Sequence, residues 1–226
     1  MQELIAATAF FLVIHLGIAG TSARAAIVQR IGEKAFRAVF SLLSIAGLVW
    51  LVRAYSRAPF EPLWTSPPWM NYVATALAFV GVVLVVVGLL TPNPTTASFE
   101  PLLKRDNVVR GMLRVTRHPF LWGVALWALG HLAANGDLAS VILFGSFLFL
   151  VLVGTVSIDA KRKRAFGEQW ERFAGVTSNV PFGAIAAGRN QLVIGEIGLW
   201  RIGVALAVFV LTLYFHAALF GVEPLP

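Results

Sequence analysis

The sequence contains no cysteine. Without thiols the chain cannot form disulfides, cysteine-ligated zinc sites, iron–sulfur clusters or a thiol nucleophile. Histidine is then the main candidate for a soft metal ligand, and there are only 4 histidines. Any metal or metallocofactor would therefore depend on a very small set of residues.

Charge is also scarce. Of the 226 residues only 13% are charged and 58% are hydrophobic, with a mean hydropathy of +0.79. Soluble domains are about 45–50% apolar and about 25% charged, so this composition excludes an ordinary soluble globule. The net charge of +7 is typical of basic cytoplasmic loops in a membrane protein, and no nucleic-acid partner is expected.

Long charge-free runs are what the sequence does have. Crossing a bilayer takes about 20 apolar residues, and six runs approach that length. They cover residues 4–20, 38–52, 73–90, 119–134, 138–158 and 202–220. We predict an all-α polytopic membrane protein: a single domain, residues 1–226, with a bundle of about six transmembrane helices surrounded by lipid.

The basic residues predict the orientation of this bundle. Of the 18 lysines and arginines, all but Arg53 and Arg57 follow the first, third or fifth run. Because cytoplasmic loops collect lysine and arginine, we expect a bacterial inner-membrane protein with both termini extracytoplasmic. Two long loops, 91–118 and 159–200, would then be cytoplasmic. The acidic start Met1-Gln2-Glu3 favours a retained first helix over a signal peptide.

Three histidines lie within the apolar runs: His15, His131 and His216. Intramembrane histidines are rare and often functional, although a single one can simply bond a carbonyl. Two that converge suit a six-coordinate haem iron in a helical bundle. Helical rise alone pairs His131 as well with His216 as with His15, so the spacing leaves the partner open. Trp127 shares the His131 face and suits a porphyrin edge or plain packing.

The block Thr116-Arg117-His118-Pro119 is a second candidate site. Its proline fits the first turn of a helix, which places Arg117 and His118 at the cytoplasmic mouth beside N–H groups that attract anions. It is either an interface anchor or a site for a carboxylate, a phosphate or a haem propionate. A tight turn at 135–137 aligns the next helix, so Asp159 is expected close to Arg117.

Several of these motifs resemble the NnrU family. They are His15 with Gly17 and Arg24, the segments 111–123 and 126–132, the Asn135-Gly136-Asp137 turn, and Asp159 ahead of Phe166-Gly167. The family is associated with bacterial denitrification, that is, with nitrite and nitric oxide reduction. It is also similar to the haem-b 15-cis-zeta-carotene isomerase.

The resemblance implies a cofactor and its ligands. It implies haem b bound by His15 and His131, with Arg117, His118, Trp127 and Asp159 as further cofactor-binding residues. The partner would be a hydrophobic small molecule or an electron-transfer protein. The chain departs from the isomerase at Ala128, where that enzyme has cysteine, so an alternate cysteine ligand is absent.

Two other functions remain open at this stage. A fainter resemblance to isoprenylcysteine carboxyl methyltransferases, which use S-adenosylmethionine, rests on residues 117–119, Asp159 and residues 166–173. Those enzymes carry adjacent glutamates where this chain has Ile158-Asp159. The third function is a non-catalytic membrane factor for the maturation of respiratory or denitrification enzymes. Whether the chain is an enzyme, and on which substrate, stays open.

Overall fold

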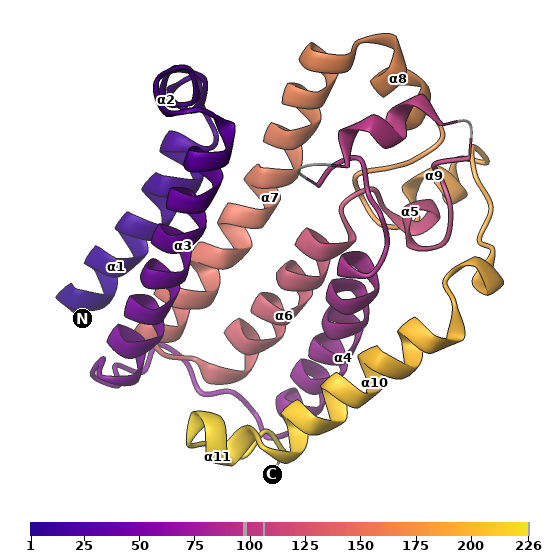
Figure 1. Cartoon of the computed structure of the whole chain (residues 1–226). Coiled ribbons are helices and arrows are strands. Elements are labelled where there is room, and N and C mark those ends of the chain that lie inside the picture. The colour runs from indigo at the N-terminus through magenta and orange to yellow at the C-terminus, as the bar shows by residue number, and fades with distance from the viewer. Residues whose placement is uncertain (97–98, 106, 226) are drawn as a thin grey trace.

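The chain folds into helices joined by loops (Figure 1). The computed structural model describes residues 1–96, 99–105 and 107–225, so positions 97, 98 and 106 of the predicted loop 91–118 and Pro226 lie outside the described residues. Within the described part no β-strand occurs, and the all-α prediction is confirmed. The elements are α1 (Gln2–Leu12), η1 (Val13–Ile18), α2 (Ala23–Ile31), α3 (Glu33–Ser56), α4 (Trp69–Leu89), η2 (Glu100–Lys104), α5 (Met112–Val115), α6 (Pro119–Asn135), α7 (Leu138–Phe166), α8 (Glu168–Gly175), α9 (Gly183–Ala186), η3 (Ile194–Glu196), α10 (Leu199–Tyr214) and α11 (His216–Phe220).

Each predicted apolar run coincides with helical structure, but not every run makes a long helix. By length and hydropathy α3, α4 and α7 can cross a membrane, and the bent pair formed by Gln2–Ile18 and Ala23–Ile31 can supply a fourth span. The last run, 202–220, is divided between α10 and the short α11. The described helices therefore provide three to four candidate spans.

The first apolar helix changes character near its end. After α1 the chain continues as a π-helix, η1, which carries His15, and then bends by 80° into α2. Lys161 of α7 donates from Nζ to the carbonyl of Ala19 at 2.8 Å, just before this bend. Because π-helical turns are rare and often occur at functional sites, this segment draws attention to His15.

Helices α4 and α6 pack backbone to backbone through small residues. A Cβ on Gly81 would lie 2.7 Å from the Gly123 carbonyl oxygen, and a Cβ on Gly123 would lie 2.5 Å from that of Gly81. One heptad away a Cβ on Gly130 would lie 2.9 Å from the carbonyl oxygen of Ala74, and at the other end Gly88 packs on the start of α6. Small residues permit close helix approach in membranes, so these positions hold α4 and α6 together as a rigid pair.

The turn between α6 and α7 has the predicted form. Gly136 adopts the left-handed conformation with φ +70°, and Asp137 caps α7 by accepting from the Ser140 amide at 3.0 Å. The amides of Leu63 and Trp64 donate to the Gly136 carbonyl, so the preceding loop covers this turn. The tight hairpin places the start of α6 and the end of α7 at the same end of the molecule.

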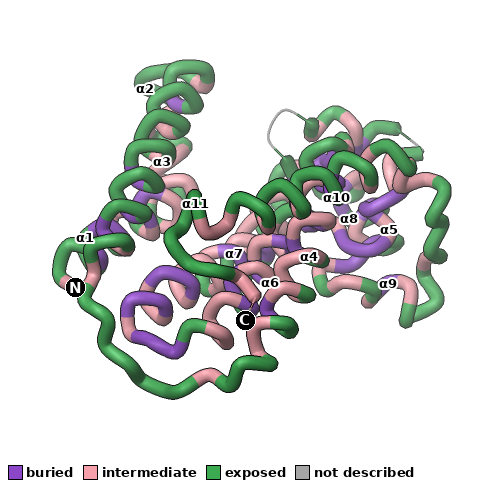
Figure 2. The backbone as a smooth tube through the Cα atoms, turned by 90° about the horizontal axis from the view of Figure 1, so that it is seen from below, coloured by how far each residue is buried: buried purple, intermediate pink, exposed green. Residues whose placement is uncertain are grey.

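The remaining helices flank the central pair of α6 and α7. Buried residues of α1, α3, α6 and α7 form one hydrophobic cluster that includes Leu4, Leu51 and Phe144. Figure 1 shows α3 and α7 meeting near this cluster and diverging toward the opposite end. On the other side α10 lies against α4, where Phe79 and Phe209 are 5.1 Å apart. Figure 2 shows buried backbone concentrated around α5–α8 and little of it in α2, α10 and α11.

Candidate functional site

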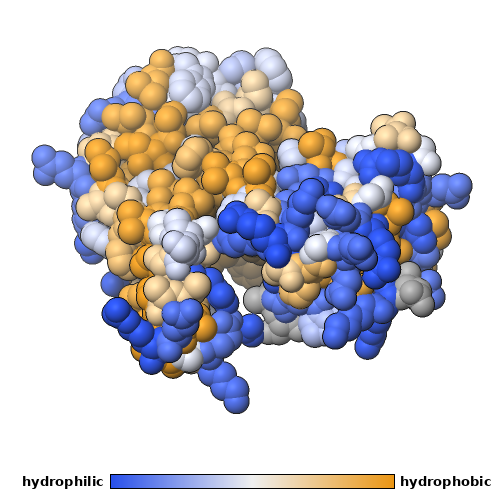
Figure 3. Space-filling view, turned by 90° about the horizontal axis from the view of Figure 1, so that it is seen from above, coloured by the Kyte–Doolittle hydropathy of each residue, from blue (hydrophilic) through white to orange (hydrophobic). Residues whose placement is uncertain are grey.

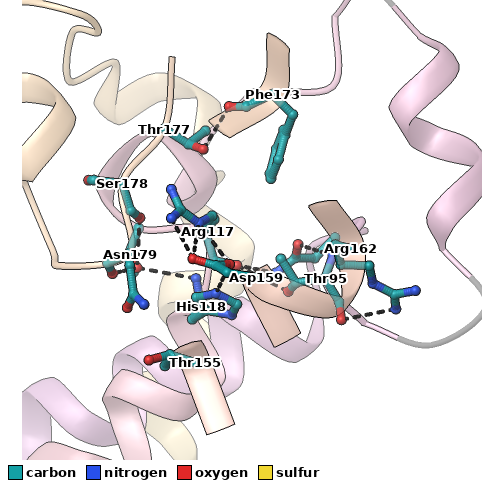
Figure 4. Close-up of polar contacts among 12 residues, drawn as sticks. Thr95, Arg117, His118, Thr155, Asp159, Arg162, Phe173, Thr177, Ser178 and Asn179 are labelled. Carbon is teal, nitrogen blue, oxygen red and sulfur yellow. Dashed lines mark hydrogen bonds and ion pairs between the residues drawn. The ribbon is translucent and has the colours of Figure 1, made fainter. Parts of the chain in front are cut away.

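The first candidate site is a polar cluster where α6 begins and α7 ends. Figure 4 shows Arg117 and His118 converging on Asp159. Arg117 donates from Nε to both carboxylate oxygens at 3.0 Å and from Nη2 to Oδ2. His118 Nε2 lies 2.7 Å from Oδ1. The predicted proximity of Arg117 and Asp159 is confirmed.

Local sequence explains how these side chains are placed. His118 is the N-cap residue of α6 and Pro119 occupies the first turn, where its missing N–H leaves no bond unmade. Asp159 projects from the last two turns of α7. The guanidinium of Arg117 lies 5.8 Å from the centre of the Trp170 ring on α8. Three helices thus enclose the ion pair, and His118 is only 2% exposed.

The backbone of the same block bonds to both long loops. The Arg117 amide donates to Ser178 O at 2.9 Å, and the Arg117 carbonyl accepts from Asn93 Nδ2 at 2.9 Å and Thr95 Oγ1 at 3.1 Å. The Thr116 hydroxyl donates to Asn179 O at 2.6 Å. The block therefore joins the segment after α4 to the segment after α8.

The electrostatics of the cluster favour a neutral imidazole beside a compensated ion pair. Burial lowers the pKa of His118, although the hydrogen bond to Asp159 acts in the opposite direction. A neutral His118 donates its Nε2 hydrogen to the carboxylate, which can only accept. The positive charge of Arg117 is then balanced by Asp159 alone. This arrangement holds the two loops on α6 and α7 without a net charge.

A second ion pair, which the sequence did not predict, lies beside the cluster. Arg114 of α5 binds Glu196 with two bonds, from Nε to Oε2 at 2.7 Å and from Nη2 to Oε1 at 3.0 Å. The Gly111 amide adds a third bond at 2.9 Å. The hydrogen bonds from Arg114 and Gly111 lower the pKa of Glu196 to about 2. This pair fastens the segment before α10 to the long loop.

The second candidate site is formed by histidines among aromatic rings. His15 Nδ1 lies 2.8 Å from the Phe11 carbonyl, and His131 Nδ1 lies 2.9 Å from the Trp127 carbonyl. Because a carbonyl only accepts, both Nδ1 atoms carry hydrogen and both Nε2 atoms keep a lone pair. No described residue hydrogen-bonds either Nε2. A histidine that ligates a metal through one ring nitrogen usually donates the hydrogen of the other to a carbonyl or carboxylate.

A row of rings separates the two histidines. Phe11 lies 4.2 Å from His15 and 5.6 Å from Phe147 between ring centres, and Phe147 lies 5.7 Å from Trp127. Trp127 in turn lies 5.0 Å from His131. The predicted ligands therefore line one apolar interface between α1, α6 and α7.

The two candidate sites are distinct. His118 and His131 are 13 residues apart on α6, about 20 Å by helical rise. Trp127, predicted on the His131 face, lies beside His131. His216 bonds the Val222 carbonyl through Nδ1 at 2.8 Å. Within the described residues no group of three or more histidine, aspartate or glutamate side chains could hold a metal ion.

Fold and sites together define a protein whose described residues are helical, with three to four candidate membrane-spanning helices. The sequence pattern of the family described as NnrU protein matches residues 3–224, and the chain belongs to this family. The resemblance predicted from the motifs is thereby confirmed.

Two curated proteins are similar to the chain. Both are chloroplastic 15-cis-zeta-carotene isomerases: that of Arabidopsis thaliana is 27% identical over 188 residues, and that of Zea mays 26% identical over 192 residues. The matches cover 80% and 82% of this chain but 50% of each isomerase, so the chain spans about half the length of these relatives. No solved structure matches the chain.

Proposed function

We propose that the chain is a haem-b-binding integral membrane protein of redox or isomerase type that acts in denitrification, in nitrite and nitric oxide metabolism. The observation that carries the proposal is the state of His15 and His131. Each imidazole is oriented by a backbone carbonyl through Nδ1 and keeps a lone pair on Nε2. Two neutral imidazoles of this kind are the donor set of a bis-histidine haem.

The surroundings of these histidines are aromatic and apolar. His15 also packs on Phe40 at 5.1 Å, and His131 stacks on Phe144 at 4.8 Å. A shared iron needs the two Nε2 atoms about 4 Å apart, so Phe11, Phe147 and Trp127 must move aside for the ring to enter between them. When bound, haem would supply a redox-active iron within the membrane.

The partner in this proposal is a hydrophobic small molecule or an electron-transfer protein, and the names of the relatives support the first. Their names describe isomerases of zeta-carotene, a long apolar polyene. At the position predicted to differ from those enzymes, Ala128 is fully buried in the hydrophobic cluster. The proposed chemistry therefore depends on histidine ligands alone, without an alternate thiolate.

The proposal includes an orientation in the bacterial inner membrane. We take residues 1–226 as a single domain with six spans, in which α6 and the α10–α11 segment join the candidate spans. The asymmetry of the basic residues supports cytoplasmic loops at 91–118 and 159–200, with both termini outside. The glycine contacts between α4 and α6 are typical of helices packed within a membrane.

A cofactor-binding role for the Arg117 cluster stays a prediction. Asp159 already occupies Nε and Nη2 of Arg117, which leaves Nη1 for an anionic group such as a propionate. We assign to Arg117, His118 and Asp159 the holding of the cytoplasmic loops. Haem binding is therefore tested at the histidines.

The test is the absorption spectrum of the purified full-length chain. Wild type should show a Soret band and sharp α and β bands on reduction, and His15→Ala or His131→Ala should remove this low-spin signature. His216→Ala is the matched control, because His216 has the same bond from Nδ1 to a carbonyl. Loss of haem in His216→Ala but not in His15→Ala would make His216 the ligand. A colourless protein would overturn haem binding, and one that binds S-adenosylmethionine would indicate a methyltransferase.

A further inference from the structure

A hollow lies between α3 and the end of α7, where these two helices have diverged. Its volume is about 550 Å³, and it is lined by Arg37, Glu100, Pro101, Lys104, Ala165, Phe166 and Gln169. The lining comes from α3 on one side and from η2, the end of α7 and α8 on the other. Figure 3, which looks onto this end of the molecule, shows a recess with a hydrophilic rim.

The charges around the hollow leave it positive. Among the described residues that line it, the one acidic side chain is that of Glu100, which is paired with Arg162, whose Nη1 lies 2.8 Å from the carboxylate. Arg37 contributes a cation and bonds Glu33 through Nε at 2.7 Å. Lys104 contributes a second cation, and among the described residues its ammonium has no partner. An anion entering the hollow therefore meets the ammonium of Lys104 beside Arg37, which is itself paired with Glu33, and a carboxylate that is paired with Arg162.

The hollow also offers a polar donor and an apolar wall. The Gln169 amide lines it and has no partner among the described residues. Pro101, Ala165 and Phe166 supply the apolar surface. Phe166 is held beneath the Arg162 guanidinium at 5.8 Å. A ligand that combines a phosphate with an apolar body matches this lining better than a small inorganic ion.

The position of the hollow matches the boundary of a bilayer. Arg37 lies in the first two turns of α3, and Ala165 lies at the last turn of α7, two helices that can each cross a membrane. In the turns of α3 next to Arg37, Phe36 and Phe40 are stacked at 5.9 Å. Basic pockets between membrane helices on the cytoplasmic side are suited to anionic lipid headgroups.

We propose that this hollow binds the phosphate headgroup of an anionic phospholipid, with Arg37 and Lys104 on the phosphate and Gln169 on its remaining oxygens. Only the assignment to the cytoplasmic leaflet rests on the proposed topology. The lipid bridges α3 to the end of α7, which make direct contact mainly at the opposite end. The lipid thereby connects the N-terminal helices, which include His15, to the helices α6 and α7, of which α6 carries His131.

The experiment measures lipid binding to the full-length chain in detergent by native mass spectrometry. Phosphatidylglycerol and phosphatidylcholine are added in equal amounts, and wild type should retain the former preferentially. Lys104→Gln should weaken phosphatidylglycerol binding about fivefold, as expected for one cation near an anionic lipid, and Lys104→Arg should restore it. Thermal unfolding confirms that each variant is folded, and the readout does not depend on haem.

The matched control is Lys163→Gln. Lys163 lies near the end of α7, the helix whose last residues line the hollow. It is 66% exposed and pairs with Glu171 outside the hollow. Lys163→Gln removes the same charge as Lys104→Gln. An equal loss of phosphatidylglycerol binding in both variants would indicate general surface attraction and overturn the site. Equal retention of both lipids by wild type would also overturn it. Binding of inorganic phosphate alone, dependent on Lys104 and without lipid retention, would assign the hollow to a soluble phosphate ligand instead.

Discussion

The two histidine-bearing regions differ in the groups that their imidazoles bond. At the start of α6, the His118 imidazole bonds a carboxylate that Arg117 also pairs with, so the cluster is ionic. Around α1 and α6, His15 and His131 each bond only a backbone carbonyl and are otherwise surrounded by aromatic rings.

This difference distinguishes a structural site, which holds helices and loops together, from a site that can bind a ligand. Buried polar groups without a partner are costly. The Arg117, His118 and Asp159 cluster is therefore explained by its structural role between helices and loops. His15 and His131 take no part in an ion pair, and each keeps a lone pair on Nε2. This lone pair is what supports the proposed cofactor role of these two histidines.

The largest expected effect is in the ionic cluster. Asp159→Asn leaves the Arg117 guanidinium, which is 13% exposed, without a counter-charge, and we expect a loss of about 3 kcal/mol in the free energy of unfolding. Thermal unfolding of the detergent-solubilised chain measures this. Glu171→Gln breaks the exposed pair with Lys163 and should change stability by less than about 0.5 kcal/mol. Similar effects in the two variants would remove the contrast.

A smaller effect is expected at Arg114 and Glu196. Because the folded pKa of Glu196 is lowered from 4.5 to about 2, its stabilisation is complete above pH 4.5 and is lost as the pH falls toward 2. Solvent screening near the surface limits it to about 1 kcal/mol. Glu196→Gln should flatten the pH dependence of unfolding within this window. An unchanged slope would show that the pair does not fasten the C-terminal segment.

The smallest effect on stability is expected at His15 and His131. His131→Gln removes one bond from a side chain to a carbonyl, and such bonds within membranes contribute about 0.6 kcal/mol on average. The variant should therefore unfold within about 1 kcal/mol of wild type when both are free of haem. A loss as large as that of Asp159→Asn would make His131 a structural residue and erase the distinction between the two regions.

Much of the fold follows from local sequence. Charge-free runs locate the helices, and Gly136 with Asp137 specifies the turn between α6 and α7 because a left-handed glycine and an aspartate cap act on adjacent residues. Because this turn makes α6 and α7 a tight hairpin, it also predicts the contact between Arg117 and Asp159. The number of spans does not follow, because α6 and α10 are shorter than a typical crossing helix.

Features that depend on distant segments could not be predicted. Glu196 finds Arg114 across 82 residues, and nothing near either residue indicates the pairing. Nothing in residues 13–18 distinguishes a π-helix from an α-helix. The glycine contacts of α4 and α6 had a signal, since Ala74, Gly81 and Gly88 recur every seven residues, but only the facing helix gives that spacing its meaning.

Rescue by exogenous imidazole tests the central claim most directly. His131→Gly removes the ligand and leaves a space of its own shape beside Phe144, so the low-spin α and β bands of the reduced protein should disappear and return when imidazole is added. His15→Gly should behave in the same way, whereas His118→Gln should retain the bands throughout. An unaltered spectrum in His131→Gly, or loss of haem in folded His118→Gln alone, would contradict the assignment of cofactor binding to His15 and His131.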